Sequence, residues 1–221
     1  MTNKAYRFLI VISGVICGYV LIKSIFFIQT RQIRTDVIQA MLVGFGLALA
    51  TAFLIAEVRS KTVNGWKTTS GCGVSGGGML LRAACTLAYP GPINSPREAM
   101  YWTASKDSAN HGLSGERNYV LRFPAGELPP NDAFWSLTMG DAKNRFVENS
   151  INRYSVSDRS GLVPNADGSV SIYIQYAAPA GLESNWLPSP EGSFILWLRV
   201  YLPGESILAG EYNVPPVVEA A

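Results

Sequence analysis

The sequence has little cysteine, little histidine and little charge. Three cysteines and one histidine occur among 221 residues. This scarcity excludes a zinc site built from Cys and His, so the sequence predicts no metal and no cofactor. The formal net charge is +2, and no stripe of basic and aromatic residues is present, so nucleic acid is not predicted as a partner.

The three cysteines also exclude the cysteine-rich framework of small secreted domains. Cys17 lies in an apolar run, where it serves as a small hydrophobic residue. Cys72 and Cys85 are close enough in sequence to form a disulfide in an oxidising compartment, but no CxxC spacing is present. The sequence leaves their pairing open.

Two long apolar runs lie near the N-terminus. Phe8–Phe27 has twenty residues with one charge, Lys23, and Val37–Ala56 has twenty with none. Each run is long enough to cross a hydrocarbon core of ~30 Å as a helix. A signal peptide fits the first run poorly, because no small-residue cleavage site follows it. Residues 1–60 are therefore predicted to form a transmembrane helical hairpin, with helices at 8–27 and 37–56.

Small residues recur in both apolar runs. Gly14 and Gly18 form a GxxxG pair, and Gly46 and Ala50 form a similar small-xxx-small pair. Such pairs allow close helix approach, so they are candidate contacts with a protein partner or a second copy of the chain. The alternative is that they only reflect the usual composition of membrane helices. The lipid bilayer is the other predicted partner.

Basic residues beside the two runs bear on orientation. With two crossings, the N-terminus and the globular domain lie on the same side of the membrane. That side has more basic residues than the linker side, which favours a cytoplasmic domain by a small margin. The residues compared are Lys4, Arg7, Arg59, Lys61 and Lys67 against Lys23, Arg31 and Arg34.

Residues 61–97 are interpreted as a linker with one short helix at Met79–Tyr89, which Pro90 ends. Trp66 belongs either to the membrane interface or to the start of the domain core. The glycine-rich run Gly71–Gly78 lacks the lysine of a phosphate-binding loop, so it is interpreted as a flexible connector.

The remainder of the chain is built of short segments rich in aromatic and β-branched residues, several of which alternate apolar and polar side chains. Frequent turn residues separate these segments. Together they predict a mainly β domain over residues 98–217, an antiparallel β-sandwich or jelly-roll-like domain. The predicted strands are Ala99–Ala104, Asn118–Phe123, Ala133–Met139, Arg145–Glu148, Val170–Tyr176 and Phe194–Leu202.

Several motifs follow one another through this domain. They are EAMYWTA, NYVLRFPAGELPP, NDAFWSLTM, SINRYSVSDR, NADGSVSIYIQ, NWLPSPEGSF, LRVYLP and a terminal VPPVV. In this order they resemble the family called domain of unknown function 1214, over roughly Glu98 to Val217. The resemblance implies a β-sandwich of jelly-roll type. Some relatives follow a domain numbered 1254, and others are short proteins with an N-terminal membrane segment.

The same resemblance bears on localisation. Bacterial relatives are commonly predicted to be exported or attached to the envelope, so the resemblance implies an extracytoplasmic domain, against the count of basic residues. The sequence is therefore interpreted as a multi-pass protein of the inner (plasma) membrane with its globular domain outside, and a cytoplasmic domain is the alternative.

The most polar motif of the domain is a candidate binding site. Its arginines have guanidinium groups that match anionic ligands, and its carboxylate allows a hydrolase acting on an envelope or carbohydrate substrate. The alternative is an internal network in which an arginine pairs with Asp158. The motif consists of Asn152, Arg153, Tyr154, Asp158 and Arg159.

Two further places are considered. Asn185 and Trp186 are adjacent, and an indole beside an amide can bind a sugar face, but a packed corner is the alternative. His111 lies in a polar loop, and no GxSxG motif supplies a serine nucleophile, so a solvated histidine is predicted there.

No catalytic motif stands out in this sequence. The leading hypothesis is therefore a non-enzymatic, membrane-anchored β-sandwich protein that binds a partner or a glycan at the cell envelope. The alternatives are the carboxylate- and arginine-based hydrolase and an accessory subunit of a membrane complex.

Overall fold

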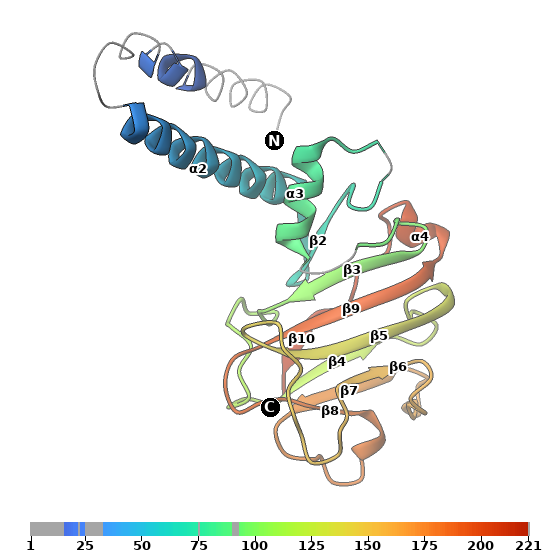
Figure 1. Ribbon diagram of the computed structural model, residues 1–221. Helices are drawn as coiled ribbons and strands as arrows, with labels where there is room; N and C mark the ends of the chain where they lie inside the picture. The colour runs from blue at the N-terminus through green and yellow to red at the C-terminus, as the bar shows by residue number, and fades with distance from the viewer. Residues whose placement is uncertain (1–15, 22, 25–32, 75, 90–92, 221) are drawn as a thin grey trace. The chain divides into compact units, whose positions relative to one another are not determined.

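The structure is a computed structural model that describes residues 16–21, 23–24, 33–74, 76–89 and 93–220 (Figure 1). The chain forms two compact units. The helical unit contains residues 1–59 and 78–90, and the β unit contains residues 60–77 and 91–221.

The helical unit is dominated by α2, Ile33–Arg59, against which α3, Met79–Ala88, packs. Thr35–Arg59 contains an 18-residue window with a mean hydropathy of 2.1 and is long enough to cross a membrane. In the predicted span 8–27, only residues 16–21 and 23–24 are described, and they are helical. The rest of that span lies outside the described residues. The described chain therefore contains one helix of membrane length, where the sequence predicted two.

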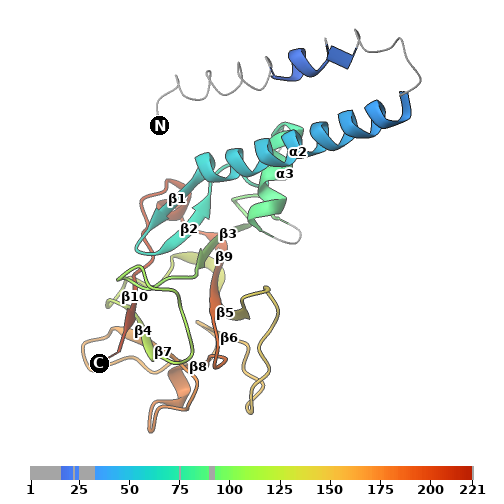
Figure 2. The same ribbon diagram turned by 90° about the vertical axis from the view of Figure 1, so that its left-hand side faces the viewer.

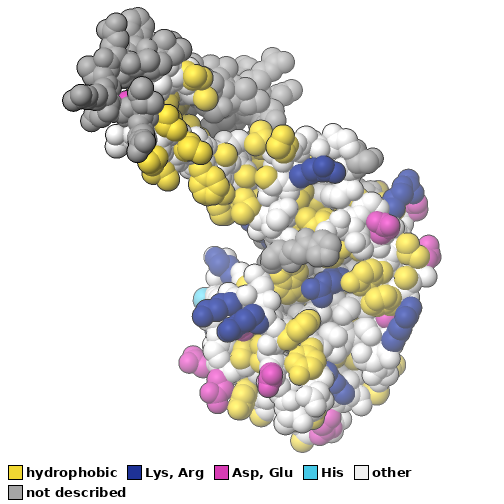
Figure 3. Space-filling view, viewed as in Figure 1, with side chains coloured by type: hydrophobic (Ala, Val, Ile, Leu, Met, Phe, Trp, Pro, Cys, Tyr) yellow, Lys and Arg dark blue, Asp and Glu magenta, His cyan; other side chains and the backbone are white. Residues whose placement is uncertain are grey.

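The surface of α2 is apolar in several directions. Met41, Leu42 and Val43 are 69%, 66% and 44% exposed. Consecutive helical residues project about 100° apart, so these three side chains cannot share one covered face. Figure 3 shows apolar side chains along this helix. A helix that is apolar all round is typical of a membrane span or of the buried centre of a large protein.

The β unit contains two sheets, which Figure 2 shows as separate layers. The six-stranded sheet is antiparallel, and its order is β1 (Ser60–Val63), β2 (Trp66–Thr69), β3 (Ala99–Ala104), β9 (Phe194–Pro203), β5 (Asn131–Asp141) and β6 (Ser155–Ser157). The other sheet has the order β10 (Val217–Glu219), β4 (Tyr119–Phe123), β7 (Val170–Gln175) and β8 (Trp186–Pro188), and β7 pairs with β8 in parallel. Two short helices complete the described unit, η1 (Glu183–Asn185) and α4 (Glu205–Leu208).

The two sheets bury their inner faces in one core. On β5, Trp135 and Leu137 are fully buried, and Leu137 lies opposite Leu198 of β9. The second sheet contributes Leu121 and Ile172 to the same cluster. Along β4 and β9 the buried positions alternate with more exposed ones, because successive side chains point to opposite faces of a sheet. The structure is therefore mainly β, as the sequence predicted.

The segment before β3 is more ordered than its sequence suggested. Residues 60–69 form the hairpin β1–β2, which pairs with β3 and places Trp66 in the core, where it is 1% exposed. Gly73 has a φ of +73°, and a Cβ atom there would lie 1.9 Å from the carbonyl oxygen of Asn94. Glycine is required at this close approach of two backbone segments.

One predicted strand, Arg145–Glu148, is wrong. Asp141 accepts backbone hydrogen bonds from Lys143 and Arg145 at 2.8 and 2.9 Å, and its carboxylate also pairs with the Arg145 side chain. These bonds hold a local turn, after which Phe146 makes a single bridge to β5. Beyond this turn β5 pairs with β6, a short strand that the sequence did not reveal.

Candidate functional site

Arg153 ties two loops of the β unit together. Its Nη1 atom donates to the carbonyl oxygens of Glu183 and Trp186 at 2.6 and 2.9 Å. Its backbone is held by Asn149, whose side chain bonds both the N–H and the carbonyl of Arg153. The loop between β5 and β6 is therefore fastened to η1 and β8 by a guanidinium group that bonds main-chain oxygens.

Asn185 and Trp186 are buried at this junction, 5% and 6% exposed. The Asn185 side chain accepts from the N–H of Val163 and donates to the carbonyls of Val163 and Ser171, all at 2.8 Å. The Trp186 indole donates to the carbonyl of Gln175 at 2.8 Å. A side chain buried in this way offers no face on which a sugar can stack. Both residues connect loops to β7.

The other residues of the predicted polar motif lie apart from Arg153. Arg159 donates to the carbonyl of Ala133 at 2.8 Å and lies 4.6 Å from the centre of the Phe134 ring. Asn152 has a φ of +51° in an exposed turn, Asp158 is exposed, and the Tyr154 ring lies against the Phe146 ring at 5.7 Å. The structure thus brings Arg153 to Trp186 but does not gather the motif into one pocket.

A different group of charged side chains does converge. Asp107 lies in the loop between β3 and β4, and its side chain is 1% exposed. Its Oδ1 atom accepts from the N–H groups of Ala109 and His111 at 2.9 and 2.8 Å. Its Oδ2 atom is buried and accepts no hydrogen bond from the described residues. A buried carboxylate oxygen without a hydrogen bond is energetically unfavourable, so a donor or a cation beside this atom would be stabilising.

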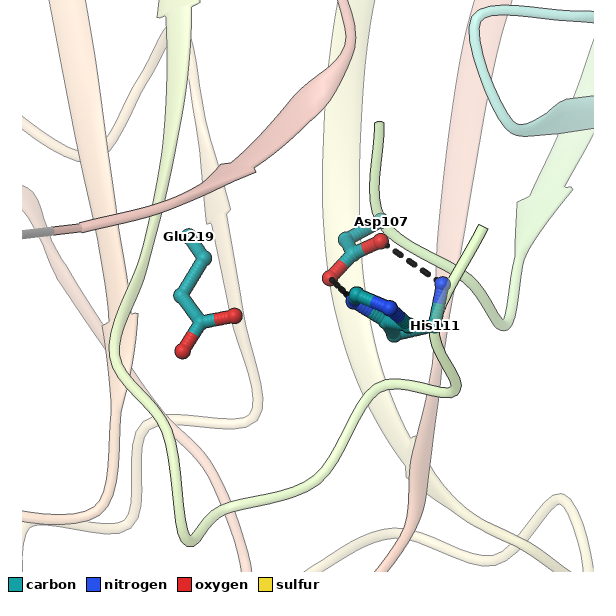
Figure 4. Close-up of side chains that lie close together, drawn as sticks. All are labelled: Asp107, His111 and Glu219. Atoms are coloured by element: carbon teal, nitrogen blue, oxygen red, sulfur yellow. Dashed lines mark hydrogen bonds and ion pairs between the residues drawn. The ribbon is translucent and has the colours of Figure 1, made fainter. Parts of the chain in front are cut away.

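His111 and Glu219 lie beside that oxygen. The Nδ1 atom of His111 is 3.6 Å from Asp107 Oδ2, and the imidazole is 63% exposed. Glu219 comes from β10, at the far end of the sequence (Figure 4). One ligand atom from each of Asp107, His111 and Glu219 lies within 4.8 Å of the other two. These three residues are named the acidic triad below.

Arg117 supplies positive charge to the acidic triad. Its Nη1 atom lies 3.3 Å from Glu219 Oε2 and 3.7 Å from Asp107 Oδ2. Its Nη2 atom donates to the carbonyl of Gly112 at 2.6 Å, and the guanidinium lies 5.8 Å from the Tyr119 ring centre. One arginine therefore partly neutralises two carboxylates, but the distance to Asp107 exceeds that of a hydrogen bond.

The sequence carried only a weak signal for this group. The loop histidine was noticed, and its solvent exposure agrees with the prediction of a solvated side chain. Glu219 is more than a hundred residues away in the chain, and the pairing of β10 with β4 brings it to the loop. Pairing between distant strands cannot be read from local spacing, so the acidic triad was missed.

These observations define a class: a mainly β chain with two sheets around one core and, in its described part, one helix of membrane length. Residues 98–205 match the family described as "Protein of unknown function (DUF1214)", and this part of the chain belongs to that family. The motifs named above therefore identified the family correctly. No protein of curated function matches this chain.

Two solved structures resemble the chain. The VPA0106 protein from Vibrio parahaemolyticus is 32% identical with a TM-score of 0.55, over 63% of this chain and 34% of that one. An uncharacterised protein from Burkholderia cenocepacia is 13% identical with a TM-score of 0.42, over 98% of this chain and 52% of that one. The chain therefore spans about a third and about half of these proteins.

Proposed function

We propose that this protein is held in a membrane by α2 and presents a β-sandwich of jelly-roll type as a binding module at the cell envelope. The observation that carries the proposal is the exposed apolar surface of α2. Phe45 and Phe53 are 65% and 56% exposed on a helix that contains an 18-residue window with a mean hydropathy of 2.1. Lipid is the environment in which such a surface is stable.

The cysteines support an extracytoplasmic β unit. Cys72, in the β unit, is disulfide-bonded, whereas Cys17 is a free thiol in the described chain. Disulfides persist in oxidising compartments and are rare in the cytosol. The chain passes from α2 directly into β1 at Ser60, so the β unit follows the C-terminal end of the membrane helix.

The count of basic residues depends on the number of crossings. With α2 as the single crossing, three basic residues lie within about 20 residues before the helix core and three after it, so the count favours neither side. They are Lys23, Arg31 and Arg34 before, and Arg59, Lys61 and Lys67 after. With the two predicted crossings the count favours a cytoplasmic β unit. The disulfide-bonded Cys72 is therefore the observation that favours an extracytoplasmic β unit.

The loops joined by Arg153 are the proposed binding face. Phe146 and Ile151, between β5 and β6, are 68% and 46% exposed, and Tyr176 and Leu182, between β7 and η1, are 56% and 43% exposed. Binding residues are commonly carried by loops on a rigid scaffold, and exposed apolar side chains are covered when a protein partner binds. The burial of Trp186 favours a protein over a glycan at this face.

The anchor is tested by extraction of membranes with alkaline carbonate. We expect the full chain to stay in the membrane pellet and to need detergent for release. Recovery of the chain in the aqueous supernatant would contradict the anchor.

The binding face is tested by in-cell cross-linking of two variants. Phe146→Ser and Tyr176→Ser should each reduce cross-linked partner, while Val218→Ser, an exposed apolar residue on β10 at 45%, serves as the matched control. Cross-links that persist in both loop variants would exclude this face.

A docking role for the membrane helix is the second candidate. A Cβ atom at Gly46 would meet no described atom within 4 Å, so this small residue of the Gly46/Ala50 pair leaves open space beside α2. Another helix can approach closely there. Gly46→Leu should weaken association with a membrane partner or a second copy if this surface is used, and Gly44→Leu, which also faces open space, is the control.

A further inference from the structure

We propose that the acidic triad, Asp107, His111 and Glu219, binds a divalent cation of the zinc class. The proposal does not depend on the membrane anchor or on the binding face, because all three residues belong to the β unit. A site of one histidine and two carboxylates differs from the cysteine- and histidine-rich zinc sites that the composition excludes.

The buried oxygen of Asp107 is the first reason. Its side chain is 1% exposed, and Oδ2 has no hydrogen-bond partner in the described part of the chain, although Oδ1 has two. The two bonds to Oδ1 fix the carboxylate, so Oδ2 is held toward His111 (Figure 4). A cation at about 2.0–2.2 Å from Oδ2 would replace the interaction that this atom lacks.

The ligand types are the second reason. Imidazole nitrogen and carboxylate oxygen are both ligands that zinc accepts, and the imidazole favours zinc-class ions over magnesium and calcium. His111 Nδ1 and Asp107 Oδ2 are 3.6 Å apart, close to the separation of two ligand atoms that share one ion. His111 and Glu219 are exposed, so small side-chain rotations can bring them to the ion. Three protein ligands leave one tetrahedral position for water.

Arg117 is the competing cation. Its Nη1 atom lies 3.3 Å from Glu219 Oε2 and 3.7 Å from Asp107 Oδ2. An ion bound by the acidic triad would repel this group, which can remain on the Gly112 carbonyl through Nη2. Replacing Arg117 by a neutral residue should therefore tighten metal binding. If Arg117 served only as a structural ion pair, its replacement would remove that pair without any gain in metal affinity.

The proposed ion would join two distant parts of the chain. Asp107 and His111 belong to the loop after β3, and Glu219 belongs to β10, which pairs with β4 at the edge of the smaller sheet. Coordination would fasten this last strand to the loop. Metal binding should consequently raise the thermal stability of the β unit, because the ion binds only the folded arrangement.

The test uses the full chain in detergent micelles, purified without a polyhistidine tag and dialysed against EDTA and then against metal-free buffer. Zn²⁺ is titrated calorimetrically. We expect one ion per chain, and His111→Ala and Glu219→Gln should each weaken binding about ten-fold or more. Saturating Zn²⁺ should raise the Tm of the wild type by about 5 °C and that of His111→Ala by clearly less at the same Zn²⁺ concentration. Absence of stoichiometric binding would overturn the proposal.

Two controls make the titration specific. Glu116→Gln removes an exposed carboxylate from the same loop and should leave the affinity unchanged. Arg117→Gln should tighten binding by about five-fold or more, the effect of one unit charge at ~4 Å in water. Weakening by Glu116→Gln equal to that of the triad variants, or weaker binding by Arg117→Gln, would overturn the assignment.

His111 is the single histidine, so its ¹⁵N imidazole signals must shift with Zn²⁺ if Nδ1 is a ligand.

Discussion

The helical unit and the β unit are both rich in apolar side chains, but they place them differently. The β unit buries its large apolar residues between two sheets, where Trp135 and Leu198 are 1% and 0% exposed. Helix α2 leaves Met41 and Phe45 69% and 65% exposed. Apolar surface is removed from water inside the β unit, whereas the described residues leave the apolar surface of α2 uncovered. A lipid bilayer would supply the apolar phase for this surface under the proposed anchoring.

The meaning of an exposed apolar side chain differs between the two units. An exposed leucine on a water-facing loop is ordinary, since much of any protein surface is apolar. A run of exposed apolar residues covering several faces of one long helix is not ordinary in water.

The largest expected effect is in the core of the β unit. Trp135→Ala removes a fully buried indole that packs against the Phe123 ring at 5.6 Å. We expect the free energy of unfolding to fall by about 3–5 kcal/mol. Urea unfolding followed by near-UV circular dichroism measures this change. A loss below about 1 kcal/mol would mean that the two sheets do not share the packed core described above.

A charge on α2 should have the next largest effect. Phe45→Arg places a guanidinium near the middle of α2 and, if α2 spans a membrane as proposed, should raise the free energy of insertion by about 3 kcal/mol. Membrane fractionation should show less integrated protein. The matched control is Val163→Arg, a loop residue of the β unit that is 57% exposed and should stay within about 0.5 kcal/mol of wild-type stability. If Val163→Arg reduced membrane integration as much as Phe45→Arg, the exposed apolar residues of α2 and of the β unit would not differ in their relation to the membrane.

Asn185 tests whether the junction beside Arg153 is structural. Asn185→Ala leaves the N–H of Val163 and two carbonyls without their partner, at a buried position. Unsatisfied buried groups of this kind cost about 1–3 kcal/mol, so we expect a loss of stability of that size. Thermal unfolding provides the measurement. A stability equal to wild type would show that water reaches these groups.

The smallest expected effect is a change in the stability of the β unit at low pH. Hydrogen bonds from the Arg145 backbone and side chain lower the pKa of Asp141 from 3.8 to about 2. The folded pKa lies below the unfolded one, so Asp141 contributes stability above pH 3.8 and loses it progressively as the pH falls toward about 2. In Asp141→Asn this part of the pH dependence should be absent. Identical acid unfolding profiles of variant and wild type would contradict the turn geometry.

Much of the β unit could be predicted from its sequence because alternation and turn residues are local signals. The predicted Ala99–Ala104 coincides with β3, and β7 and β9 differ from their predictions only at the ends. The hairpin β1–β2 was missed because its strands have four residues each, too short for alternation to stand out. The prediction of a return strand after Asp141 was wrong because the Asp141 carboxylate accepts hydrogen bonds from the backbone N–H groups of Lys143 and Arg145 and holds a local turn there.

The candidate sites were harder to predict for a different reason. Polar residues that are close in sequence, such as Arg153 and Asp158, looked like a site, but the fold directs Arg153 to the carbonyls of η1 and β8. The acidic triad depends on β10 reaching the loop after β3, a contact between distant segments. The spacing of residues along the sequence carries no information about such a contact. The family could be predicted from the sequence because that prediction required only the order of the motifs.

Sidedness is the most direct test of the account. A single exposed cysteine is introduced by the substitution Lys143→Cys in the β unit, with Cys17→Ser to remove the free thiol. Intact cells are treated with a membrane-impermeant maleimide before and after permeabilisation. If α2 spans the membrane and the β unit lies on the oxidising side, the introduced thiol is labelled in intact cells wherever that side is accessible to the reagent. Labelling only after the cytoplasmic membrane has been opened would contradict the proposed arrangement.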